Sequence, residues 1–186
     1  NICTSQVLLA VIAGFYAIYH GPHGLSLIAG RIHRYTQIMA EGLQQLGYEI
    51  LTEHYFDTFV VHIPSKAKRF IAKAQEVEIN LRMLDTDHIG ISLDETTNQT
   101  VIHKVWRIFA SVVADQPDIN VLDKGIVDCI PAEYLRQDAI LQHEVFHKYH
   151  SETEMMRYMR KLARKDIALD RSMIPLGSCT MKLNAA

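Results

Sequence analysis

The sequence has few cysteines, no glycine-rich loop and no long apolar run. Its three cysteines lie far apart, at positions 3, 129 and 179, and no C-x-x-C pair occurs. An odd, scattered set of this kind argues against a disulfide framework and fits a reducing compartment. No apolar stretch approaches the roughly 20 residues that a membrane span requires. No G-x-G-x-x-G string or comparable glycine cluster offers a phosphate-binding loop. We therefore expect no membrane partner.

A strong charge of one sign is also absent. Lys and Arg number 19 against 21 Asp and Glu, so the formal net charge is -2. This balance gives nucleic acid no general electrostatic attraction to the chain, and we expect no nucleic-acid partner. Hydrophobic residues make up 48% of the 186 residues. That share is ordinary for a globular protein of one domain, or of one domain plus an extension.

The apolar spacing predicts the element order α-α-β-β-α-β-β-α over the first 114 residues. Helices are expected at 5–19, around 28–43, after an N-cap at Ser65 and after an N-cap at Thr97 or Asn98, and strands at 48–52, 58–63, 79–83 and 88–93. The first helix is apolar around nearly its whole circumference, which predicts that it is buried between two larger bodies. Short strands packed under helices on one face make a compact α+β unit.

Residues 115–150 are expected to form an irregular connector, and this connector contains the string His143-Glu144-x-x-His147. H-E-x-x-H is the metal-binding string of zinc proteases, in which both histidines lie one turn apart inside a continuous helix. Here Ser151 and Glu154 form a capping box, which predicts that the helix starts only after the string. We therefore interpret the histidines as coincidental and expect neither a metal site nor a zinc hydrolase.

Five stretches of the sequence resemble the P-protein family of the glycine cleavage system. They are NICTSQVLLA (1–10), YHGPHGL (19–25), HYFDT (54–58), GISLDETT (90–97) and YHSETEMMRYMRKLARKDIALDRSMIPLGSCTMKLNAA (149–186). The resemblance runs essentially from end to end, although Val11 stands where Asn is usual in the family. It implies an oxidoreductase of amino-acid catabolism, a glycine dehydrogenase that decarboxylates glycine with pyridoxal phosphate. The aminomethyl group then passes to the lipoyl arm of H-protein.

The resemblance also implies a domain organisation. In the long form of the family, two aminotransferase-like halves of fold type I lie in tandem. Residues 1–114 would be the small C-terminal domain of the first half, and residues 115–150 the connector, with a short helical turn at 131–136. Residues 151–186 would be a helix and the first residues of the second, catalytic half. The sequence is then expected to be an excerpt of a longer, homodimeric polypeptide. Its compartment would be the cytoplasm in a bacterium or the mitochondrial matrix in a eukaryote.

The resemblance places the Schiff-base lysine of the family beyond residue 186, so we expect no catalytic residue in this chain. Residues near the substrate or cofactor are expected in the loop 175–184. The candidates are Ser178, Cys179, Thr180 and Asn184. Hydroxyl and amide groups offer hydrogen bonds to a carboxylate or phosphate. Lys182 is interpreted as an ordinary lysine, because a Schiff-base lysine needs an enclosing pocket.

A second hypothesis belongs to a different class. The sequence contains no complete catalytic constellation, which also fits a non-catalytic structural or interaction module. Such a module would dock a partner through its α+β body and the basic face of its last helix. The first hypothesis instead names two partners, the remainder of the P-protein chain and lipoylated H-protein.

Overall fold

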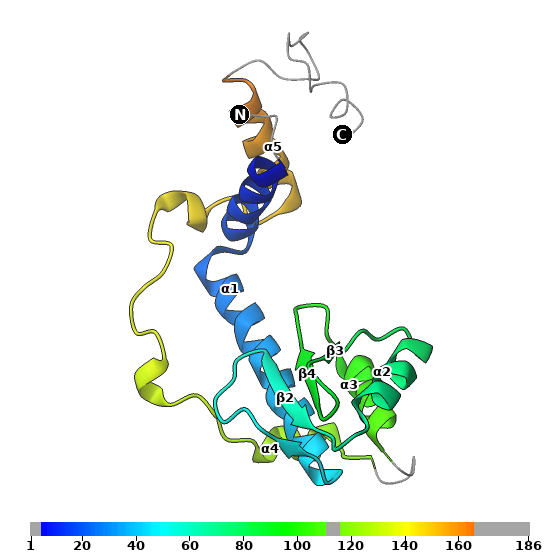
Figure 1. The fold of residues 1–186 in the computed structure, drawn as a ribbon. Helices are drawn as coiled ribbons and strands as arrows, with labels where there is room; N and C mark the ends of the chain where they lie inside the picture. The colour runs from blue at the N-terminus through cyan, green and yellow to red at the C-terminus, as the bar shows by residue number, and fades with distance from the viewer. Residues whose placement is uncertain (1–4, 111–115, 166–186) are drawn as a thin grey trace. The chain divides into compact units, whose positions relative to one another are not determined.

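The computed structural model describes residues 5–110 and 116–165, which divide into two compact units. One unit holds the described part of residues 1–26 and 138–186, and the other holds that of residues 27–137. Helix α1 (Ser5–Gln45) begins in the first unit and ends in the second (Figure 1). No helix within the described ranges combines the length and apolarity needed to cross a bilayer.

The 27–137 unit is built on a four-stranded antiparallel sheet with the strand order β1-β2-β4-β3. The strands are β1 (Glu49–Ile50), β2 (Thr58–His62), β3 (Arg82–Met83) and β4 (His88–Ser92). Phe59 pairs with Ile91 and Val61 with Ile89 across the two central strands. All four side chains are buried. Because side chains alternate along a strand, these four lie on one face of the sheet.

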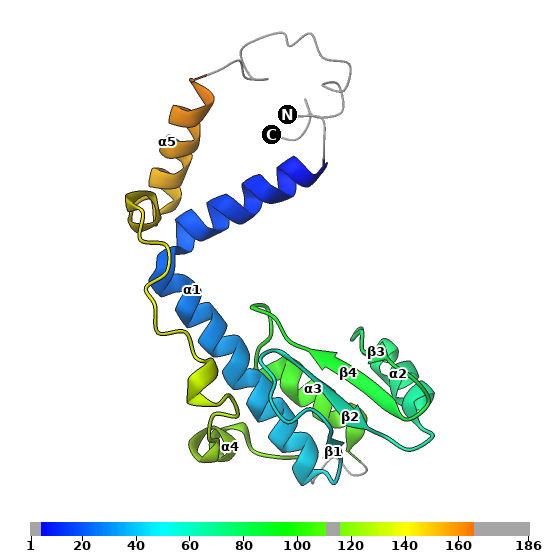
Figure 2. The same ribbon diagram turned by 60° about the vertical axis from the view of Figure 1, so that its left-hand side comes forward.

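Three helical segments contribute to the core with that face: the second half of α1, α2 (Ala67–Glu76) and α3 (Gln99–Phe109) (Figure 2). Trp106 of α3 is fully buried, and its indole N–H donates to the Met39 carbonyl of α1 at 3.1 Å. The prediction of an α+β unit is confirmed, and so is the order of its elements. The strands are shorter than predicted at both edges of the sheet.

The two predicted N-caps of this unit have different outcomes. Asn98 caps α3, since its side chain accepts a hydrogen bond from the Val101 N–H at 3.2 Å. The cap predicted at Ser65 is wrong. Ser65 has a positive φ of 53°, and its N–H donates to the Asp87 carboxylate at 2.6 Å. The helix therefore begins later, at Ala67, with no side-chain cap.

The predicted connector contains one helix that the sequence did not indicate. Helix α4 (Ile119–Gly125) is capped by Asp118, whose carboxylate accepts from the Asn120 N–H at 2.8 Å. Ile119 and Leu122 are buried, so this short helix completes the core of the 27–137 unit. The short turn predicted from Pro131 is confirmed as a 3-10 helix at Ala132–Tyr134.

In the other unit, the first part of α1 packs against α5 (Glu152–Ala163). The ring of Phe15 meets that of Tyr158 edge-on at 6.2 Å between centroids. The predicted interruption after Tyr19 is confirmed at Gly21, which has φ 62° and ψ -179° inside an otherwise helical run. A Cβ at position 21 would lie 2.6 Å from the His150 ring, so both backbone and space require glycine.

The burial predicted for residues 5–19 is not found in the described structure. Leu8 and Leu9 are 61% and 66% exposed, and Ile12 is 54% exposed. Only one flank of this helix meets α5, so most of its apolar circumference faces outward. The helix is apolar as predicted, but among the described residues only α5 packs against it.

Candidate functional site

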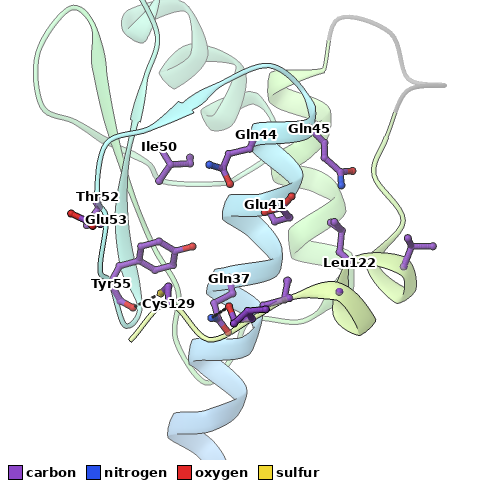
Figure 3. Close-up of a pocket in the computed structure, with 14 residues that line it drawn as sticks. Gln37, Glu41, Gln44, Gln45, Ile50, Thr52, Glu53, Tyr55, Leu122 and Cys129 are labelled. Atoms are coloured by element: carbon purple, nitrogen blue, oxygen red, sulfur yellow. Dashed lines mark hydrogen bonds between the residues drawn. The ribbon is translucent and has the colours of Figure 1, made fainter. Parts of the chain in front are cut away.

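A cleft of about 620 Å³ lies in the 27–137 unit, beside the last turns of α1 (Figure 3). Three stretches form its walls: one face of α1, the residues from β1 to Tyr55, and the end of α4 with the segment that follows it. The side chains that α1 contributes are Gln37, Glu41, Gln44 and Gln45. The cleft is therefore polar along the helix and apolar near Ile50 and Leu122.

The electrostatics of the cleft disfavour an anionic ligand. Glu41 and Glu53 are the charged residues of its described lining, which contains no Lys or Arg. A phosphate group placed here would meet two carboxylates and no cation. Burial raises the pKa of Tyr55 to about 12, and the neighbouring Cys129 and Glu41 add to this shift. Tyr55 therefore stays a neutral phenol near pH 7 and offers one O–H.

Cys129, which lines the cleft, comes together with His33 and Asp128. Their ligand atoms all lie within 4.8 Å of one another. The Nε2 atom of His33 is 3.0 Å from the Asp128 carboxylate, and its Nδ1 atom is 2.8 Å from the Phe56 carbonyl. His33 is only 7% exposed, whereas Asp128 is exposed. Nothing in the sequence indicated this cluster, because His33 and Asp128 are 95 residues apart.

The segment that carries Asp128 and Cys129 is fixed along α1 by hydrogen bonds. Gln37 donates to the Val127 carbonyl at 3.1 Å, and Arg34 donates to the Ile126 carbonyl at 3.2 Å and to the Asp123 carboxylate at 2.7 Å. The Asp128 carboxylate also accepts from the Ile130 N–H at 2.9 Å. The hydrogen bonds from Ile130 and His33 hold the pKa of the Asp128 carboxyl below its usual range. This segment has no regular secondary structure, but hydrogen bonds fix it along α1.

The H-E-x-x-H string does not form a metal site of the protease kind. Residues Glu144–His147 form a 3-10 helix, and α5 begins only after the cap at Ser151. The Nδ1 atom of His143 accepts from the Val145 N–H at 3.2 Å, and the Nε2 atom of His147 lies 3.1 Å from the Leu141 carbonyl. Both rings are therefore engaged by separate backbone groups, and the prediction that the string precedes the helix is confirmed.

A second hollow, of about 440 Å³, lies at the start of α5. Its lining consists of His147, Lys148, Tyr149, His150, Glu154 and Arg157. Lys148 forms an ion pair with Glu144, and their hydrogen bond raises the pKa of Lys148 and lowers that of Glu144. His150 contacts the Tyr19 carbonyl through Nδ1 at 2.7 Å. These two side chains are committed to the fold of this unit, which leaves Arg157 as the cation that faces the hollow.

The site residues predicted from the sequence lie outside the described residues. Ser178, Cys179, Thr180, Asn184 and Lys182 all fall within 166–186. Their expected positions near a substrate or cofactor therefore stay predictions.

Comparison with known proteins gives a consistent match. A family model described as "Glycine cleavage system P-protein" matches residues 1–109. The chain belongs to this family. Proteins named "Glycine dehydrogenase (decarboxylating)" from Klebsiella pneumoniae (strain 342) and Escherichia coli O81 (strain ED1a) are each 55% identical to it over 191 aligned residues. The alignments cover 100% of this chain and 20% of each relative, so the chain spans about a fifth of the length of these relatives.

The charge of the described cleft indicates whether it could bind pyridoxal phosphate. Pyridoxal phosphate requires donors or cations for its phosphate and a lysine for its aldehyde. The described lining of the cleft contains no lysine and no cation to balance its two carboxylates, so these residues do not fit that cofactor. We derive no catalytic step from the cleft.

Proposed function

We propose that this chain is part of a pyridoxal-phosphate-dependent glycine dehydrogenase (decarboxylating) of the glycine cleavage system. The observation that carries this proposal is the 55% identity to relatives of that name, sustained over the whole chain. The complete protein would decarboxylate glycine and transfer the aminomethyl group to the lipoyl arm of H-protein. The cofactor would supply the electron sink for this chemistry.

Within this proposal, residues 1–114 form the small domain of the first aminotransferase-like half, of fold type I. Residues 115–150 connect the halves, and residues 151–186 start the catalytic half. The antiparallel sheet with its helices supports the first assignment, and the cap at Ser151 supports the start of a new element there. We further propose a homodimer for the complete protein. Its compartment would be the cytoplasm in a bacterium or the mitochondrial matrix in a eukaryote.

The cofactor would be held by residues outside those described. Ser178, Cys179, Thr180 and Asn184 are proposed to lie near it, as donors to a carboxylate or phosphate or, for Cys179, as a neighbouring thiol. The proposal predicts that the 186-residue chain alone does not bind pyridoxal phosphate. Absorbance titration with pyridoxal phosphate, followed by glycine, should show no new saturable band. A band that responds to glycine would contradict this, and Lys182→Ala would then identify the amine.

A chimera tests whether the chain serves the proposed activity. The matching segment of the Escherichia coli relative is replaced by this sequence, and exchange of glycine carboxyl carbon with bicarbonate is measured in the presence of H-protein. We expect activity of the same order as the parent enzyme. A second chimera carries Trp106→Ala, which leaves a cavity in the core. It should lose stability and activity together. A first chimera that folds and binds cofactor but catalyses no exchange would argue against the proposed function.

A further inference from the structure

We propose that His33, Asp128 and Cys129 form a binding site for one divalent transition-metal ion, with zinc as the ion that their donor chemistry favours. The three side chains bring a ring nitrogen, a carboxylate oxygen and a thiol sulfur within 4.8 Å of one another. The sequence predicted no metal site, and the spacing of these residues gives no such signal. The site differs from the H-E-x-x-H string, which lies in the other unit.

The separations fit a tetrahedral ion after small side-chain rotations. Bonds of about 2.0 Å to nitrogen or oxygen and about 2.3 Å to sulfur place ligand atoms about 3.3 to 3.6 Å apart. His33 Nε2 and the Asp128 oxygen are now 3.0 Å apart, so a bound ion requires them to separate slightly. The sulfur of Cys129 lies within 4.8 Å of both atoms, so it has to move closer to them by a rotation of its side chain.

His33 is already oriented as a metal ligand. A carbonyl can only accept, so the contact of 2.8 Å between Nδ1 and the Phe56 oxygen places a proton on Nδ1. Nε2 faces Asp128 and Cys129, and it donates to the Asp128 carboxylate until an ion takes the place of its proton. Metal-binding histidines characteristically donate their second N–H to a carbonyl or carboxylate in this way. The ring also stacks on Phe56, with 6° between the planes, and only 7% of the residue is exposed.

The other two ligands, Asp128 and Cys129, lie on a segment that hydrogen bonds already fix in the absence of an ion. Cys129 is positioned by its carbonyl, which His54 contacts through Nδ1 at 2.9 Å, and by its thiol, which lies 3.4 Å from the Tyr55 carbonyl. The hydrogen bonds from Gln37 and Arg34 to the same segment hold it along α1. Preorganised ligands lose little conformational freedom on binding, which favours affinity.

The donor set selects the ion. A thiolate with an imidazole and a carboxylate suits zinc and its neighbours, whereas magnesium and calcium prefer oxygen ligands alone. Because Asp128 is exposed, an ion can enter from solvent and keep a water molecule as its fourth ligand. Binding releases the thiol proton of Cys129 and the Nε2 proton of His33 to solvent, and it bridges α1 to the segment after α4.

Cobalt(II) titration of the purified protein tests the site, because cobalt replaces zinc and reports its ligands by absorbance. We expect visible bands of tetrahedral cobalt and a near-ultraviolet thiolate-to-metal band, saturating at one equivalent per chain. Zinc should abolish both by competition. Absence of a saturable band in the wild-type protein would overturn the proposal, whatever its variants do.

Matched variants then assign the ligands. Cys129→Ser should remove the thiolate band, whereas Cys179→Ser should leave it. Asp128→Asn should weaken binding by about tenfold or more, whereas Asp138→Asn should not. Circular dichroism of the metal-free variants checks that they fold. A thiolate band that persists in Cys129→Ser, or weak binding of several ions, would show adventitious binding. The readout does not involve glycine, so its outcome is separate from that of the proposed function.

Discussion

The indole of Trp106 lies directly against the backbone of Gly42. A Cβ atom built on Gly42 would approach the Cε2 and Cζ2 atoms of that ring to 2.3 Å. The same helix also fixes the indole by a hydrogen bond, since the indole N–H donates to the Met39 carbonyl at 3.1 Å. Glycine at position 42 is therefore what lets α1 and α3 approach each other in the core.

Gly42→Ala is expected to destabilise the protein. The added methyl group overlaps a buried ring that cannot move without losing its hydrogen bond. Overpacking of this kind costs about 1–3 kcal/mol, which exceeds the gain of up to about 1 kcal/mol from replacing a helical glycine by alanine. Urea denaturation followed by circular dichroism measures the change in the free energy of unfolding.

Gly30→Ala is the matched control on the same helix. Gly30 is exposed, and a Cβ there would meet nothing within 4 Å. Only the propensity gain then applies, so this variant should be more stable than wild type by about 0.5–1 kcal/mol. Equal effects of the two substitutions would contradict the close packing of Trp106 on α1.

Asn98→Ala should weaken the start of α3. The side chain of Asn98 accepts from the Val101 N–H, which otherwise has no partner inside the helix. Loss of such a cap costs about 1 kcal/mol in the free energy of unfolding. Gln99→Ala, one residue later on the exposed surface, is the control and should change stability little. Asn98→Ser should recover most of the loss, and failure of this rescue would count against a capping role.

The carboxyl group of Asp94 should titrate below its usual range. Its oxygen accepts from the hydroxyl and the N–H of Thr96, at 2.6 and 2.9 Å, and these bonds lower the pKa of Asp94. A folded-state pKa below the unfolded value adds stability above the unfolded pKa. That contribution is lost as pH falls through the folded pKa.

NMR titration of the side-chain carboxyl of Asp94 measures this pKa directly. Thr96→Val removes the hydroxyl donor and should raise the pKa of Asp94 toward that of a free aspartate. Thr100→Val, on the exposed first turn of α3, should leave it unchanged. A wild-type pKa at or above the usual aspartate value would show that the hydrogen bonds to Thr96 do not form in solution.

Local signals in the sequence were enough to predict most of the α+β unit. Asn98 and Ser151 are polar caps directly before apolar helical patterns, and both form the hydrogen bonds that their residue types predict. The cap predicted at Ser65 does not form. Ser65 has a positive φ, and its N–H donates to the carboxylate of Asp87, which is distant in sequence. Tertiary contacts of this kind override a local preference.

The candidate metal site could not be predicted from the sequence. His33 lies on a helix whose pattern indicates only packing, and Cys129 is a single cysteine in a region that looked irregular. Helix α4 brings the two together, and its seven residues Ile119–Gly125 are too few to show a clear periodicity. The family resemblance implies site residues at 178–184 and none at these three positions.

The hydrogen bonds between α1 and residues 126–128 also determine where the part of the connector that is not bonded to α1 begins. Since the hydrogen bonds from Arg34, Gln37 and His33 hold the segment up to residue 128, the tether toward α5 starts near Ile130 rather than near Gln116.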